Sequence, residues 1–156
     1  MIPKIRRVLY ATDLSQNSVY AFRYAVNTAE KHDAEIVILH VIEEIPPAFR
    51  SYYQIADTDI QSRKEETIEI LSKRLDEFCK SELRERTESL KRIKKVEVKS
   101  GVPAEMILSV SNDQNCDVII MGTHGKGLLT HTFLGSVAER VLKRSRKPIF
   151  VIPLPE

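Results

Sequence analysis

The chain has 156 residues, of which 42% are hydrophobic, and this suits one ordinary soluble domain with a buried core. The formal net charge of +2 is close to balance, so charge gives no global reason to expect a nucleic acid or an anionic membrane as a partner. No stretch approaches the roughly 18 apolar residues of a membrane span, no apolar signal region opens the chain, and the two cysteines are expected to be free thiols, so the composition predicts a cytoplasmic protein.

Apolar runs of strand length alternate with helical patterns in the first half of the chain. This half predicts, in order, a strand over 5–12, a helix over 16–31, a strongly apolar strand over 34–42, a segment without clear periodicity over 43–59 and a long helix over 60–90. Ser15 is the candidate N-cap of the first helix. In the long helix, apolar residues such as Ile68, Leu71 and Leu75 recur at spacings of three and four, with charges between them.

The second half continues the alternation. It predicts a strand over 93–99, a short helix from 103, a strand over 117–122, a helix over 132–144 and a strand over 148–152. In the first of these strands, Lys95, Glu97 and Lys99 alternate imperfectly with apolar residues, as in an edge strand with one face in water. Strands that alternate with helices throughout predict a parallel sheet covered on both faces, and residues 1–156 are therefore expected to form one α/β domain.

The stretch MGTHGKGLLTHTFLGSV, residues 121–137, is the most informative part of the sequence. A glycine-rich turn between a strand and a helix lets backbone N–H groups approach a phosphate closely. It is not a Walker loop, because Ile120 stands five residues before Gly125 and Gly127 follows the Gly-Lys pair. It is not the dinucleotide fingerprint either, because Thr130 stands where the third glycine is needed. The stretch therefore predicts an anion site of another kind, for a nucleotide phosphate.

The pattern Gly-x2-Gly-x9-Gly-Ser in this stretch resembles the nucleotide loop of the ATP-binding universal stress proteins. The strand ending YATD, the His40-Val41 pair and the final KPIFVIP also match that family's layout, so the resemblance covers essentially the whole chain. It implies a three-layer sandwich around an open five-stranded parallel sheet of order 3-2-1-4-5. Strands one and four then meet where the winding reverses, which is the ligand position of such sheets. Asp13 and the glycine loop would converge on that crevice.

The resemblance implies ATP as the ligand. A divalent ion, Mg²⁺ or Mn²⁺, is expected with it because triphosphates usually carry one, and the residues themselves suggest no catalytic group and no protein-bound metal. The residues that the resemblance places around the adenosine are Ala11, Thr12 and Asp13, with Val41 at the adenine and Met121 and Gly122 at the ribose. The residues it places around the phosphates are Gly125, Lys126, Gly135, Ser136 and Val137, with His124 pointing at a phosphate or at water. The N–H groups of Ser136 and Val137 begin a helix, so they are free donors in a favourable dipole.

Simpler interpretations stand beside these. Asp13 could be only a helix-entry residue, and Lys126 could be only solvated. His40, His124 and His131 invite a zinc hypothesis, but no cysteine or carboxylate joins them at ligand spacing. The basic residues of 140–147 suit the end of a helix, where cations offset the dipole.

The last strand, Ile149–Ile152, is apolar on both faces and is an edge strand in the implied order. An apolar unpaired edge needs a cover, so we expect a homodimer through this strand. The sequence leaves three functions open. The first is an ATP-binding regulatory protein of the stress-response type. The second is a slow, partner-stimulated ATP hydrolase, which the absence of an evident general base near the loop disfavours. The third is a dimeric scaffold that binds no nucleotide.

Overall fold

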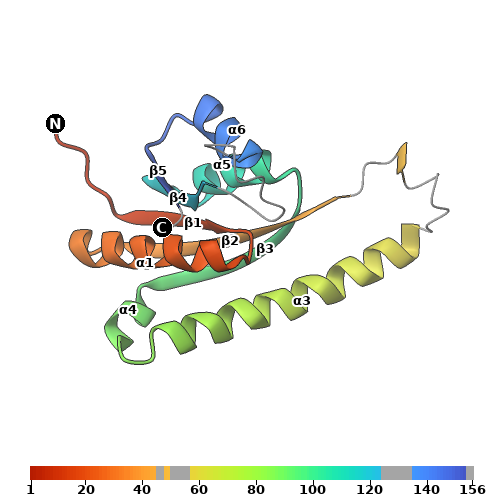
Figure 1. The fold of residues 1–156 in the computed structure, drawn as a ribbon, viewed down its shortest axis with the longest axis horizontal. Helices are drawn as coiled ribbons and strands as arrows, with labels where there is room; N and C mark the ends of the chain where they lie inside the picture. Colours follow the sequence, from red (N-terminus) through yellow and green to blue (C-terminus); the bar gives the residue numbers. More distant parts are fainter. Residues whose placement is uncertain (45–47, 50–56, 124–134, 154–156) are drawn as a thin grey trace.

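The computed structural model describes residues 1–44, 48–49, 57–123 and 135–153. Five strands form one parallel sheet in the order β3-β2-β1-β4-β5. The elements are β1 Arg7–Thr12, α1 Gln16–His32, β2 Glu35–Glu43, α3 Asp57–Glu82, α4 Thr87–Lys91, β3 Ile93–Gly101, α5 Pro103–Asp113, β4 Val118–Gly122, α6 Ser136–Arg144 and β5 Ile149–Ile152. Helices α1, α3 and α4 cover one face of the sheet, and α5 and α6 cover the other (Figure 1). The expected three-layer α/β fold and its strand order are confirmed.

The sheet separates two hydrophobic cores. In β1, Val8 and Tyr10 face the core under α1 and α3, whereas Leu9 and Ala11 face the core under α5 and α6. This follows from the two-residue period of a strand. Because helices lie on both faces, a central strand is apolar along its whole length rather than alternating.

Strand β3 departs from simple alternation. Its pairing with β2 passes from Ile36 opposite Ile93 to Val37 opposite Lys95, so Lys94 is an extra residue in a β-bulge. After the bulge, Glu97 stands opposite Leu39, which belongs to the core under α5 and α6, and the side chain of Glu97 is only 9% exposed. The expectation that Glu97 faces water was therefore wrong, whereas the edge position of this strand is confirmed.

The long helix expected over 60–90 is two helices. α3 ends at Glu82 and α4 begins at Thr87. The buried face of α3 includes Leu75 and Cys79, and Leu83 continues it just after the helix ends. Residues 84–86, which follow, are charged and offer that face no apolar side chain. The chain therefore turns, and it enters β3 by way of the short α4.

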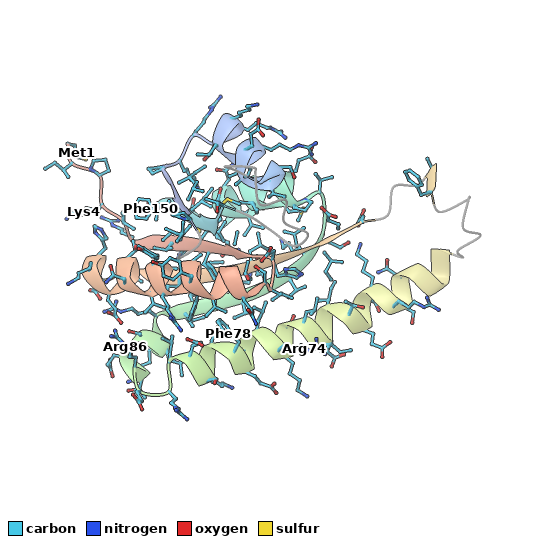
Figure 2. The ribbon with its side chains drawn as sticks, viewed as in Figure 1. Met1, Lys4, Arg74, Phe78, Arg86 and Phe150 are labelled. Atoms are coloured by element: carbon cyan, nitrogen blue, oxygen red, sulfur yellow. The ribbon has the colours of Figure 1, made fainter. Side chains whose placement is uncertain are left out.

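Aromatic side chains of α1 and α3 pack against each other and against the sheet. The ring of Phe22 on α1 lies 5.4 Å from that of Tyr10 on β1 and 5.1 Å from that of Phe78 on α3. Figure 2 shows Phe78 on the side of α3 that faces the sheet. The other half of α3 extends past the sheet (Figure 1). Charged residues break up the apolar face of this long helix. Within the described ranges, no helix is long and apolar enough to cross a membrane.

Candidate functional site

The carboxyl ends of β1 and β4 lie side by side at the centre of the sheet. Their pairing runs from Val8 opposite Val118 to Tyr10 opposite Ile120. After β1 the chain crosses to α1 on one face, and after β4 it continues to α6 on the other face. The winding reverses between these strands, which is where open parallel sheets bind ligands.

The turn that follows β1 fixes the direction of a carboxylate. Asp13 Oδ1 accepts hydrogen bonds from the backbone N–H of Ser15 at 2.9 Å and from its hydroxyl at 2.5 Å. Ser15 is also the N-cap of α1, as expected, because its Oγ accepts from the Ser18 N–H at 3.3 Å. Leu14 has a φ of 66°, and its N–H donates to Thr12 Oγ1 at 3.0 Å. The turn is therefore held by side chains at each step.

The second oxygen of this carboxylate is in a different situation. Asp13 Oδ2 is buried and has no hydrogen-bond partner among the residues that the structure describes. A buried acceptor without a donor costs about 1–3 kcal/mol, and more when it is charged. Such an atom calls for an explanation. A donor on a bound molecule would supply one.

A histidine lies beside the turn. His40 on β2 stands opposite Thr12 on β1, and both are buried. Its Nδ1 lies 2.8 Å from the carbonyl oxygen of Thr12. Because a carbonyl oxygen only accepts, the assigned tautomer has the proton on Nδ1, which donates.

The start of α6 is tied to the ends of β4 and β5. The Gly135 N–H donates to the Thr123 carbonyl at 2.5 Å, and the Thr123 N–H donates to the Ile152 carbonyl at 3.0 Å. Gly135 is the N-cap, without a capping side chain among the described residues. The N–H groups of Ser136 and Val137 lie in the first turn of α6, where no intrahelical acceptor reaches them. They form a donor pair at the positive end of a helix dipole.

The structure brings most of the sequence-predicted site residues to one edge of the sheet. The residues that end β1 and β4 are Ala11, Thr12, Met121 and Gly122, and Val41 lies two residues before the end of β2. The residues just beyond a strand or at the start of α6 are Asp13, Gly135, Ser136 and Val137. His124, Gly125 and Lys126 lie outside the described residues. One expected detail changes: the N–H of Gly135 is taken by Thr123, so this glycine would serve a phosphate by its small size. The hydrogen bond between His40 and the Thr12 carbonyl was not predicted, because sequence reasoning treated His40 only as part of the His40-Val41 pair and as a possible metal ligand.

Among the residues that the structure describes, the remaining polar groups do not form a metal site or a reactive thiol site. Within the described ranges, no cluster of three or more His, Cys, Asp or Glu side chains could hold a metal ion. Cys79 and Cys116 are free and buried, as expected. Burial raises the pKa of Cys79 to about 12 and that of Cys116 to about 11. These thiols therefore stay protonated near neutral pH and make poor nucleophiles.

A parallel α/β sheet with a carboxylate and a helix N-terminus at its switch point defines a class of small ligand-binding domains. The model of the universal stress protein family matches residues 4–153. The chain belongs to this family. Its resemblance to the family, expected from the sequence, is thereby confirmed.

Individual relatives agree with this assignment. Universal stress protein MJ0577 of Methanocaldococcus jannaschii is 31% identical over 153 residues, which are 94% of each chain. The solved structure of MJ0577 superposes with a TM-score of 0.65 over 99% of both chains. Universal stress protein MJ0531 of the same organism is 31% identical over 97% of this chain and 84% of its own length. A universal stress protein in complex with cAMP shares the fold at a TM-score of 0.56 and 19% identity, over 97% of this chain and 98% of that one.

Proposed function

We propose that this protein binds ATP as a regulatory nucleotide at the switch point between β1 and β4. The observation that carries the proposal is the buried Asp13 Oδ2, which has no partner among the described residues. It belongs to the same sheet edge as the uncapped N-terminus of α6. The Asp13 oxygen can accept a hydrogen bond from a ligand donor, and the N-terminus of α6 can bind a ligand anion. A nucleotide supplies both.

The adenosine would occupy the end of β1. Ala11, Thr12 and Asp13 would line its pocket, with Asp13 Oδ2 accepting from a hydroxyl or amino group. Val41 follows His40 on the neighbouring strand, where its backbone would reach the adenine. The side of the ribose toward β4 would contact Met121 and Gly122, the last residues of that strand.

The phosphates would lie at the start of α6. The N–H groups of Ser136 and Val137 and the Ser136 hydroxyl are the donors there, and the small Gly135 allows close approach. Each hydrogen bond to a charged phosphate oxygen contributes about 1.5–3 kcal/mol net. A few of them match the roughly 8 kcal/mol of micromolar binding after association costs. His124, Gly125 and Lys126 complete the proposed phosphate site from the sequence pattern.

A divalent cation would bind mainly through the phosphates and water, as Mg²⁺ usually does. We assign it no protein ligand and assign the chain no catalytic residue. The proposed role is regulatory: occupancy of the site alters a surface that a partner recognises, in the cytoplasm expected from composition.

Released nucleotide tests this proposal. The purified protein is denatured, and its extract is analysed by chromatography; a titration with ATP follows by calorimetry. Bound ATP or a micromolar dissociation constant supports the proposal. ADP that accumulates on incubation would favour the slow hydrolase, and the absence of both nucleotide and heat of binding would favour the empty scaffold.

We also propose a homodimer through Ile149–Ile152. β5 pairs with β4 along one side, and the side chain of Phe150, which Figure 2 labels, is 40% exposed. A second copy that adds its own β5 would cover this apolar edge. Light scattering at micromolar concentration gives the mass directly, and a monomer would exclude the arrangement.

A further inference from the structure

The hydrogen bond from His40 to Thr12 lies where the ladder between β1 and β2 ends. Thr12 opposite His40 is the last pair of that register. Both residues are 8% exposed, and Nδ1 reaches the carbonyl oxygen at 2.8 Å. A side chain therefore holds a backbone carbonyl at the point where the chain leaves the sheet.

The carbonyl that accepts this bond belongs to the peptide between Thr12 and Asp13. A peptide unit is planar, so a bond to its oxygen restrains ψ of Thr12 and φ of Asp13 together. These two angles set the direction of the Asp13 Cα–Cβ bond. His40 thus acts on the direction of the carboxylate through the backbone.

The carboxylate is restrained separately at its other end. Asp13 Oδ1 accepts from the N–H and hydroxyl of Ser15. With the backbone held by His40 and one oxygen held by Ser15, the second oxygen, Oδ2, has one direction available. That oxygen is the buried one without a described partner.

We propose that His40 is a positioning residue for the nucleotide. Its Nδ1–H orients the Thr12–Asp13 peptide so that Asp13 Oδ2 meets a donor group of the nucleoside. This inference rests on the proposed function, because it assigns His40 a role in that same site. Preorganisation of this kind raises affinity by removing the cost of ordering the acceptor on binding.

The geometry requires a donor at the position of Nδ1. The amide nitrogen of asparagine lies three bonds from Cα, as Nδ1 does, whereas that of glutamine lies four bonds away, as Nε2 does. Leucine has a similar size and no donor. If the imidazole of His40 only filled space, the ATP affinity of each variant would follow its folding stability, wherever its side-chain donor lies.

The experiment uses the full chain with His40→Asn, His40→Gln and His40→Leu, each titrated with ATP in the presence and absence of Mg²⁺. Ser111→Ala is the control for stability, because Ser111 is buried in α5 and bonds within that helix. Urea unfolding without nucleotide measures the stability of every variant. We expect the Asn variant to bind within about threefold of wild type, and the Gln and Leu variants to bind about tenfold more weakly. The Ser111→Ala variant should bind as wild type.

A double-mutant cycle identifies the route of the effect. If His40 acts through Asp13, then His40→Leu should cost little affinity once Asp13→Ala has removed the carboxylate. Equal losses in the two backgrounds would overturn the inference. So would Gln and Leu variants that bind like wild type, or an Asn variant as weak as Leu at equal stability. If His40→Leu does not fold, the comparison of His40→Asn with His40→Gln tests the positioning role.

The two proposals fail differently. Wild-type protein that binds ATP, with His40 variants that bind equally well, overturns the positioning role alone. Wild-type protein that binds no ATP overturns the proposed function and this inference together.

Discussion

Replacing Asp13 by asparagine should weaken ATP binding without weakening the unliganded fold. The asparagine side-chain oxygen can still accept from Ser15, as Oδ1 does in the structure. Its NH₂ group would then stand in place of Oδ2, so a donor would meet the donor of the nucleoside.

The size of the loss follows from the bond removed. A hydrogen bond to a charged group contributes about 1.5–3 kcal/mol, and each 1.4 kcal/mol is tenfold in affinity. The dissociation constant for ATP should therefore rise by about tenfold to 150-fold. Without nucleotide, the change removes a buried charged oxygen that lacks a described partner, so the free energy of unfolding should stay the same or rise by about 1 kcal/mol.

Calorimetric titration with ATP and urea unfolding without it measure the two quantities. Asp113→Asn is the matched control, since it makes the same change of charge on an exposed residue at the end of α5. An Asp13→Asn protein that binds ATP as tightly as wild type would refute the reasoning. So would one that loses affinity only in proportion to lost stability.

Three further predictions follow. Gly135→Val should abolish measurable ATP binding, because the valine side chain would enter the phosphate site. The circular dichroism and melting curve should stay near wild type, because valine can adopt the φ of −69° and ψ of 156° found at Gly135. If ATP binding survives this change, the proposed position of the phosphates is wrong. Phe150→Glu should convert a dimer to a monomer in light scattering, since two like charges would face each other at the covered edge; a variant that remains a dimer would point to another interface. Alkylation at pH 8, followed by mass spectrometry, should be slower in the native state than in denaturant by about 100-fold for Cys116 and about 1000-fold for Cys79, because burial raises their pKa values from 9.0 to about 11 and about 12. Equal rates would contradict their burial.

Local patterns in the sequence were sufficient for the elements whose boundaries depend on neighbours along the chain. Ser15 begins α1 as an N-cap, and Pro103 begins α5, because a capping hydroxyl and a fixed φ act within one turn. The strand order came from the family resemblance. The apolar periodicity predicted too long a helix at α3, because the repeat stops at Leu83 and the helix ends one residue earlier, at Glu82.

The amino-acid sequence by itself determined the alternation of strands and helices and the residue types at the carboxyl edge of the sheet, because period, caps and glycine turns are local properties. Only the tertiary structure decided how those residues meet. The register of β3 after the bulge places Glu97 beside Leu39 on a helix-covered face. The register of β1 and β2 brings His40 to the Thr12 carbonyl, and Asp13 keeps one oxygen without a described partner. Each of these depends on contacts between residues far apart in the chain, whose spacing carries no periodic signal.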